Sequence, residues 1–175
     1  DRRDLNRSFP GSEKGSLAAR IAYVFDQEIL SKATHGIDLH TAAVHRTNLP
    51  QIRGSLDTPE VRKLALAFGA PVMINANIRD GSLRQAALEQ GIPMLVYEAG
   101  EALRFSESSI KQGVRGILAI MEEIGMIDRV GSAGTQNSTY EARSSYWVRA
   151  PSSGLFFPKK SLGSHVAKGD TIAVI

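Results

Sequence analysis

The chain has 175 residues, of which 42% are hydrophobic and 22% charged, as in ordinary globular proteins of about one to one and a half domains. Its formal charge is +3, from 21 Lys and Arg against 18 Asp and Glu, and the arginines are scattered, so a nucleic-acid surface is not expected. The absence of cysteine excludes disulfides, thiolate metal ligands and a cysteine nucleophile, and suits a cytoplasmic protein. No apolar stretch approaches the roughly 20 residues of a membrane span, so no membrane association is expected.

The first half of the chain predicts helices and strands in alternation. A stripe of apolar residues at helical spacing predicts an amphipathic helix within residues 12–30: Leu17, Ile21, Val24, Phe25 and Ile29. The segment "GIDLH" (36–40) alternates and predicts a short strand with Asp38 and His40 on one face. Residues 41–54, "TAAVHRTNLPQIRG", are expected to form a loop. Asp57-Thr58-Pro59 then has the residue order of a helix start, which predicts a helix over 60–69.

The next segments continue the alternation. We expect a strand in 70–77, a helix in 81–91 that is closed by Gly91, and a helix in 106–126 that begins at a Ser-rich cap. Between them, "IPMLVYEAG" (92–100) is an apolar run ending in Glu98, typical of a strand buried on both faces. Residues 1–127 therefore predict a layered α/β domain with a mixed, largely parallel sheet.

The character of the chain changes after Ile127. Residues 128–139, "DRVGSAGTQNST", are rich in Gly, Ser and Asn and predict a linker. Residues 140–175 contain short β-prone pieces separated by glycines, which predicts a small all-β module.

Two ionisable residues stand where two predicted strands end. His40 closes the first strand and Glu98 closes the apolar one. Ligands of open α/β sheets bind beyond the carboxyl ends of the strands, so these residues are a site hypothesis on position alone. Imidazole is a common zinc ligand, and a nearby carboxylate is the usual base for a zinc-activated water. The alternative is that His40 is a hydrogen-bonded structural histidine and Glu98 an acid that caps a helix.

A second set of candidates is cationic. Asn6 and Arg7 could hold a substrate carboxylate, because arginine offers a planar fork of donors and asparagine a donor and an acceptor at short reach. The alternative is a turn in which Asp4 and Asn6 bond local backbone. Arg46 belongs to the polar loop after His40 and is expected to line the same crevice. Arg84 is a weaker anion-binding candidate, and the alternative for it is a surface cation.

Five segments together resemble the succinylglutamate desuccinylase/aspartoacylase family, zinc deacylases related to the zinc carboxypeptidases. They are "DLNRSFPG" (4–11), "DLHTA" (38–42), "RTNLPQIR" (46–53), "YEAGE" (97–101) and "RAPSSGLF" with the following G..V.KGD pattern (149–170). The resemblance covers essentially the whole chain in the family's motif order. It implies a zinc-carboxypeptidase-like α/β domain followed by a β-rich module.

The resemblance also implies roles by position. His40 is similar to the last of three zinc ligands, and Glu98 to the general base that deprotonates the water. Asn6 and Arg7 resemble the pair that holds the substrate carboxylate, with Arg84 as a further contributor. The implied activity is zinc-dependent hydrolysis of the amide bond of a small N-acyl amino acid. The other two ligands are expected from an upstream His-x-x-Glu motif, which the sequence lacks, so we expect the natural polypeptide to be longer and both domains incomplete.

Three other functions stay open. One is a peptidase of the carboxypeptidase type, another is a metal-free binding protein with the same fold, and the last is a carrier module around Lys168, because the final hairpin resembles the turn of biotinyl-like domains. The oligomeric state is open as well, with a homo-oligomer as one option because family members often pair. The acyl group and the amino acid are not predicted.

Overall fold

A mixed five-stranded sheet lies at the centre of the larger of two compact units, Asp1–Arg143 and Ser144–Ile175. The computed structural model describes residues 3–128 and 139–175. The strand order is β1-β4-β2-β3-β5, and only the β2–β4 pair is antiparallel. The strands are β1 (Gly36–Ala42), β2 (Asn48–Gly54), β3 (Val72–Asn75), β4 (Met94–Glu101) and β5 (Tyr140–Ala142). The predicted layered α/β class with a largely parallel sheet is therefore confirmed.

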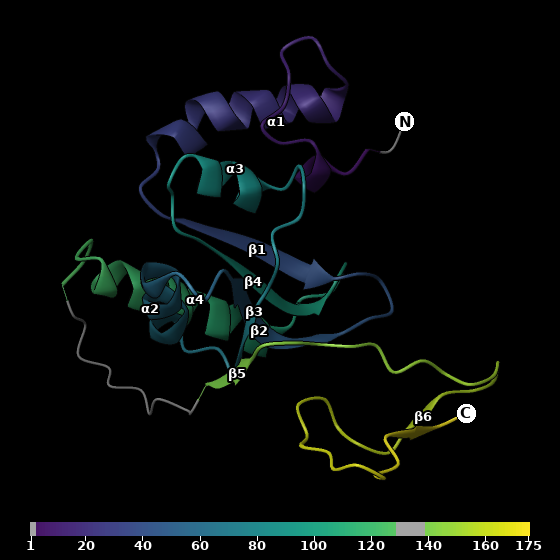
Figure 1. The fold of residues 1–175 in the computed structure, drawn as a ribbon. Coiled ribbons are helices and arrows are strands. Elements are labelled where there is room, and N and C mark those ends of the chain that lie inside the picture. Colours follow the sequence, from purple (N-terminus) through teal and green to yellow (C-terminus); the bar gives the residue numbers. More distant parts are fainter. Residues whose placement is uncertain (1–2, 129–138) are drawn as a thin grey trace. The chain divides into compact units, whose positions relative to one another are not determined.

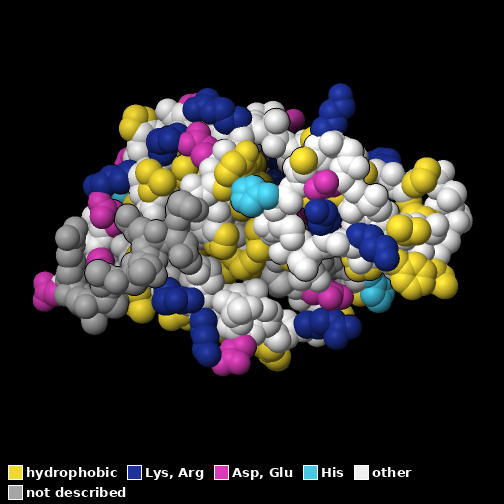
Figure 2. Space-filling model, turned by 90° about the horizontal axis from the view of Figure 1, so that it is seen from below, with side chains coloured by type: hydrophobic (Ala, Val, Ile, Leu, Met, Phe, Trp, Pro, Cys, Tyr) yellow, Lys and Arg dark blue, Asp and Glu magenta, His cyan; other side chains and the backbone are white. Residues whose placement is uncertain are grey.

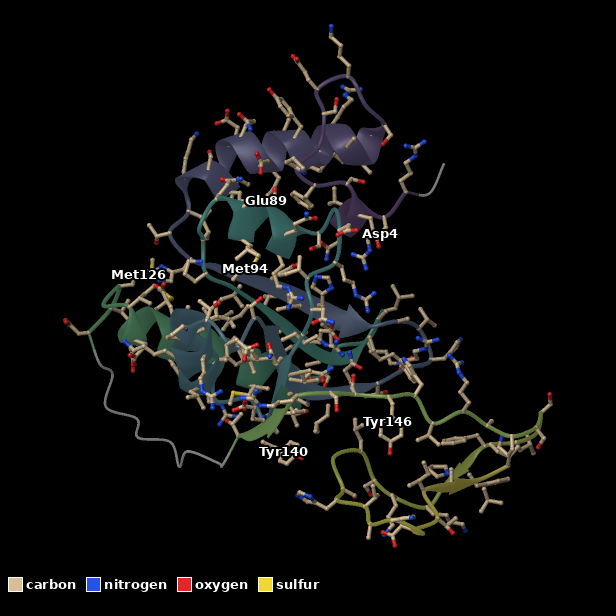
Figure 3. The ribbon with its side chains drawn as sticks, in the orientation of Figure 1. Asp4, Glu89, Met94, Met126, Tyr140 and Tyr146 are labelled. Carbon is tan, nitrogen blue, oxygen red and sulfur yellow. The ribbon has the colours of Figure 1, made fainter. Side chains whose placement is uncertain are left out.

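Helices cover both faces of this sheet (Figure 1). The helices of the first unit are η1 (Leu5–Arg7), α1 (Leu17–Glu28), η2 (Leu30–Lys32), α2 (Pro59–Phe68), α3 (Leu83–Glu89) and α4 (Glu107–Glu123). On one face, α2 and α4 pack over a core that includes Phe68, Leu95 and Ile120. On the other, Leu30 and Ala87 form a smaller core with Met94, which lies between α3 and the sheet (Figure 3). The two faces of β4 thus belong to two different cores.

The helix boundaries follow from residues that the sequence makes visible. Helix α2 begins with Thr58 and Pro59 and ends at Gly69 in the left-handed conformation, as predicted. The Ser82 and Ser106 hydroxyls accept backbone N–H groups at the starts of α3 and α4. None of the helices in the described ranges is long and apolar enough to cross a bilayer.

Residues 48–54 are a central strand, so the prediction of a loop over 41–54 was wrong in this part. Pro50 disfavours a strand locally, because it cannot donate a ladder hydrogen bond. In the structure Pro50 lies where the register between β2 and β4 shifts, between the pairs Asn48–Gly100 and Gln51–Glu98. A bulge accommodates a proline within a strand, because the ladder is interrupted there.

Helix α1 forms where it was predicted, but its apolar stripe is not the buried face. Ala22 and Asp26 are buried, whereas the side chains of Leu17, Ile21 and Val24 are 71%, 47% and 58% exposed. The buried carboxylate of Asp26 is not left unpaired, since the side-chain amide of Gln90 donates to it at 2.8 Å.

The predicted linker, residues 128–139, lies almost wholly outside the described residues. The segment that follows it differs from the expected boundary at residue 140. Tyr140–Ala142 pair with β3, and Arg62 binds Glu141 through both guanidinium nitrogens, so β5 belongs to the first unit. The second unit therefore begins at Ser144, and it contains the antiparallel strands β6 (Phe157–Pro158) and β7 (Ala173–Val174).

Charged side chains of both signs are interspersed with hydrophobic ones on the face drawn in Figure 2. This mixture agrees with the small net charge of +3. In the second unit, for example, Lys160 binds Asp170 at 3.0 Å and holds the pKa of that carboxyl below its usual range.

Candidate active site

His40 and Glu98 are direct neighbours in the sheet. They are register partners in the parallel pair β1–β4, so their side chains project from the same face of the sheet. We had expected each residue to end its strand, but this was wrong, because β1 continues to Ala42 and β4 to Glu101. The sheet thus places an imidazole beside a carboxylate near the carboxyl ends of both strands.

The imidazole of His40 has a carboxylate partner. Its Nε2 lies 2.8 Å from Oδ2 of Asp38, which stands two residues earlier on the same strand face. This hydrogen bond raises the pKa of His40, and partial burial opposes the rise. Asp38 therefore fixes the orientation of the His40 ring at the cavity.

The carboxylate of Glu98 is bound by side chains from β2. Asn48 and Gln51 donate their amide N–H groups to Oε2 at 3.1 and 3.3 Å, and Nε of Arg53 lies 3.4 Å from the same oxygen. Three polar side chains of β2 therefore surround one oxygen of the Glu98 carboxylate.

The segment that contains Asn6 and Arg7 forms the short helix η1, which docks on the start of α3. Asp4 caps η1 by accepting the backbone N–H of Asn6 at 2.9 Å, so the predicted local turn does exist. The Asn6 side chain, however, also contacts a segment that is distant in the sequence, because its Oδ1 accepts a hydrogen bond from the backbone N–H of Leu83 at 2.9 Å. This bond ties η1 to the helix that carries Arg84.

These residues line one cavity of about 270 Å³. Its lining is Asn6, Arg7, Asp38, His40, Arg53, Ala76, Asn77, Arg79, Ser82, Arg84, Val96 and Glu98. The structure thus brings together five of the six predicted site residues, from η1, β1, β4 and α3. The sixth, Arg46, does not line the cavity and is an exposed residue of the turn that precedes β2.

The cavity contains buried arginine nitrogens that make no hydrogen bond, although Arg53 Nε forms an ion pair with Glu98. In the described ranges, the buried side-chain nitrogens and oxygens that lack a hydrogen bond are Arg53 Nε and Arg84 Nη1, and both residues line this cavity. Burial and the charges of Arg53 and Arg79 lower the pKa of Arg84. Buried donors are almost always satisfied, so this arrangement is suited to a ligand with anionic oxygens. Arg84 is therefore not a surface cation.

A larger cavity of about 480 Å³ adjoins this one and shares Asn6, Asp38 and His40 with it. Apolar side chains, among them Phe9 and Phe25, line its other side. A substrate with an apolar portion has room beside the charged cavity.

The described residues do not make up a zinc site by themselves. Among them, no group of three or more His, Cys, Asp or Glu side chains is arranged to hold a metal ion. His40 contributes an imidazole, but Nε2 is engaged with Asp38, and His35 contacts Glu60 at 3.4 Å instead. His45 lies in the turn before β2, where its backbone N–H binds Glu101.

Sequence reasoning did not single out two charged residues of the cavity, Asp38 and Arg79, as site residues. Asp38 could have been found, because the alternation of "GIDLH" places it on the face of His40. Arg53 belongs to the polar segment that was expected to line the crevice as a loop, and it does line the cavity, but from strand β2 and next to Glu98. Arg79 stands in a stretch without regular secondary structure, and no pattern in the sequence indicated it.

A close backbone approach holds η1 against the loop before α3, and it yields a prediction. Gly81 has φ +69°, and a Cβ atom there would lie 2.6 Å from the carbonyl oxygen of Arg7. We expect Gly81→Ala to displace Arg7, which should raise KM and lower Tm. Gly91→Ala is the matched control, since Gly91 has φ +72° but no atom within 4 Å of such a Cβ. Equal effects of the two variants on KM would show that the contact with Arg7 is unimportant.

The chain is similar in sequence to a known family of proteins and to one of its relatives. The model of the succinylglutamate desuccinylase/aspartoacylase catalytic domain matches residues 1–124. The N-alpha-acetyl-L-2,4-diaminobutyric acid deacetylase of Halomonas elongata is 29% identical over 179 residues, which cover 97% of this chain and 52% of that protein.

Two solved structures extend the comparison. A succinylglutamate desuccinylase/aspartoacylase from Rhodobacter sphaeroides has a TM-score of 0.81 at 28% identity, over 98% of this chain and 54% of the other. The ectoine utilization protein EutE (DoeB) from Ruegeria pomeroyi shares the fold, with a TM-score of 0.84 at 24% identity over 99% and 55% of the two chains. The chain spans about half the length of these relatives.

Proposed function

The chain belongs to the succinylglutamate desuccinylase/aspartoacylase family, and from this premise we propose that the protein hydrolyses the amide bond of a small N-acyl amino acid. The observation that carries the proposal is that Glu98, His40, Arg7 and Arg84 line the same cavity. A base, an imidazole and cationic donors in one cavity are the parts that hydrolysis of a carboxylate-bearing amide needs.

Glu98 is the proposed general base. It takes a proton from the attacking water, whose oxygen forms a bond to the carbonyl carbon of the substrate. The same carboxyl then delivers the proton to the nitrogen as the C–N bond breaks, so that a carboxylate and a free amine are released. Asn6 and Arg7 hold the substrate carboxylate, which orients the scissile bond towards Glu98.

We propose Zn²⁺ as the cofactor, with His40 as one ligand and the other ligands supplied by residues other than those described. When bound, the ion lowers the pKa of its water towards about 7 and stabilises developing negative charge. Arg84 has an unpartnered buried N–H group that is suited to a substrate oxygen. Arg46 is not part of this proposal, because it does not line the cavity.

The test is a substrate panel with the intact protein. Nα-acetyl-2,4-diaminobutyrate, N-succinylglutamate and N-acylaspartate are incubated beside short peptides with free carboxyl termini, and the released amine is quantified. We expect turnover of at least one N-acyl amino acid and none of the peptides. Cleavage of peptides alone would favour a carboxypeptidase-type enzyme, and binding without turnover would favour a metal-free binding protein.

A further inference from the structure

The segment "RTNLPQIR" forms most of β2, and three of its polar side chains converge on a single atom. Asn48, Gln51 and Arg53 all approach Oε2 of Glu98, at 3.1, 3.3 and 3.4 Å. Among the described residues, no hydrogen bond reaches the other oxygen, Oε1. One oxygen of the carboxylate is therefore held by two amide hydrogen bonds and an ion pair with Arg53, while the other is left for a ligand.

The bulge at Pro50 makes this convergence geometrically feasible. Side chains alternate between the faces of a regular strand, so Gln51 and Arg53 share a face, and Asn48 belongs to the opposite one. Between the pairs Asn48–Gly100 and Gln51–Glu98 lie two residues of β2 but only one residue of β4. The extra residue shifts the register and brings Asn48 to the face of Gln51.

We propose that Asn48, Gln51 and Arg53 are positioning residues, which hold Glu98 through Oε2 so that Oε1 receives the proton of the attacking water. The proposal rests on the role of Glu98 as the base. All three side chains come from one strand that is paired with β4 in the sheet, and a strand supports a side chain more rigidly than a loop does. A general base is effective only when its reacting oxygen stays within hydrogen-bond reach of the water.

Single and double variants of the intact protein test this proposal. We expect Asn48→Ala and Gln51→Ala each to lower kcat by about 10-fold, and the double variant by about 10²-fold, because small misplacements of a reacting group are that costly. KM should change by less than about twofold, since neither amide lines the substrate cavity. Thr47→Ala, just before β2, is the matched control and should leave kcat and Tm unchanged.

The same substitutions are then made in the Glu98→Gln background. If the three residues act only through Glu98, their substitution should cause no further loss of kcat in the Glu98→Gln background. An unchanged kcat in the single variants, or an equal loss in both backgrounds, would overturn the positioning role while Glu98 remains the base. Full activity of Glu98→Gln itself would instead refute the proposed function. Arg53→Lys keeps the positive charge but moves it away from Oε2 of Glu98, so its kcat should fall between those of the wild type and the amide variants. A wild-type kcat would exclude Arg53 from the set.

Discussion

Replacing Glu98 with Gln is expected to lower kcat by about 10²- to 10⁴-fold, the usual contribution of a general base. The substitution keeps the shape of the side chain and leaves an oxygen for the amides of Asn48 and Gln51, so the fold should survive. What it removes is the ability to accept a proton from water. The rate of amine release from the best substrate of the panel, measured together with Tm, gives the result.

Glu101 provides the matched control for this substitution. It belongs to the same strand, but it binds the backbone N–H of His45 at 2.9 Å and contacts Arg104 at 3.3 Å, and it does not line the cavity. These partners lower the pKa of Glu101, the N–H of His45 most of all. Glu101→Gln should therefore leave kcat within a few-fold of wild type, and a loss as large as that of Glu98→Gln would mean that the base has been misassigned.

Changing Arg7 to Ala is expected to raise KM by about 10- to 100-fold, with a smaller effect on kcat. The loss of a hydrogen bond to a charged group costs about 1.5–3 kcal/mol, and each 1.4 kcal/mol corresponds to a factor of ten in affinity. The measurement is steady-state kinetics with an N-acyl amino acid.

The control for Arg7 is a change in the substrate. The corresponding compound with an amide in place of the free carboxylate lacks the group that Arg7 holds, so the wild type and Arg7→Ala should turn it over alike. If KM for the carboxylate-bearing substrate were the same in both proteins, Arg7 would not be the clamp.

Much of the fold was predictable, because periodicity and caps are local signals. Thr58-Pro59 and Gly69 mark the ends of α2, and the unbroken apolar run marks β4 as a strand buried on both faces. The failures came where tertiary pairing overrides local preference. Strand β2 contains a proline, which locally disfavours a strand. The segment forms a strand only because it pairs with β3 and β4.

The candidate site was predictable to a similar extent. His40 and Glu98 were singled out by their places in the sequence, and the sheet makes them neighbours. The contacts of Gln51 and Arg53 with Glu98 depend on the register of an antiparallel pair, which no sequence period specifies. Arg46 shows the opposite case, since it shares a motif with Arg53 yet lies outside the cavity.

The most direct test of the proposed zinc deacylase is the zinc-to-protein ratio of the intact, dialysed protein, measured alongside its turnover of N-acyl amino acids, for the wild type and for His40→Ala. We predict a ratio near one with turnover for the wild type, and a lower ratio with loss of turnover for His40→Ala, because His40 is proposed as a ligand. A wild-type protein that takes up no zinc from excess metal, or a ratio that His40→Ala leaves unchanged, would contradict the assignment of this cavity as the zinc-dependent site.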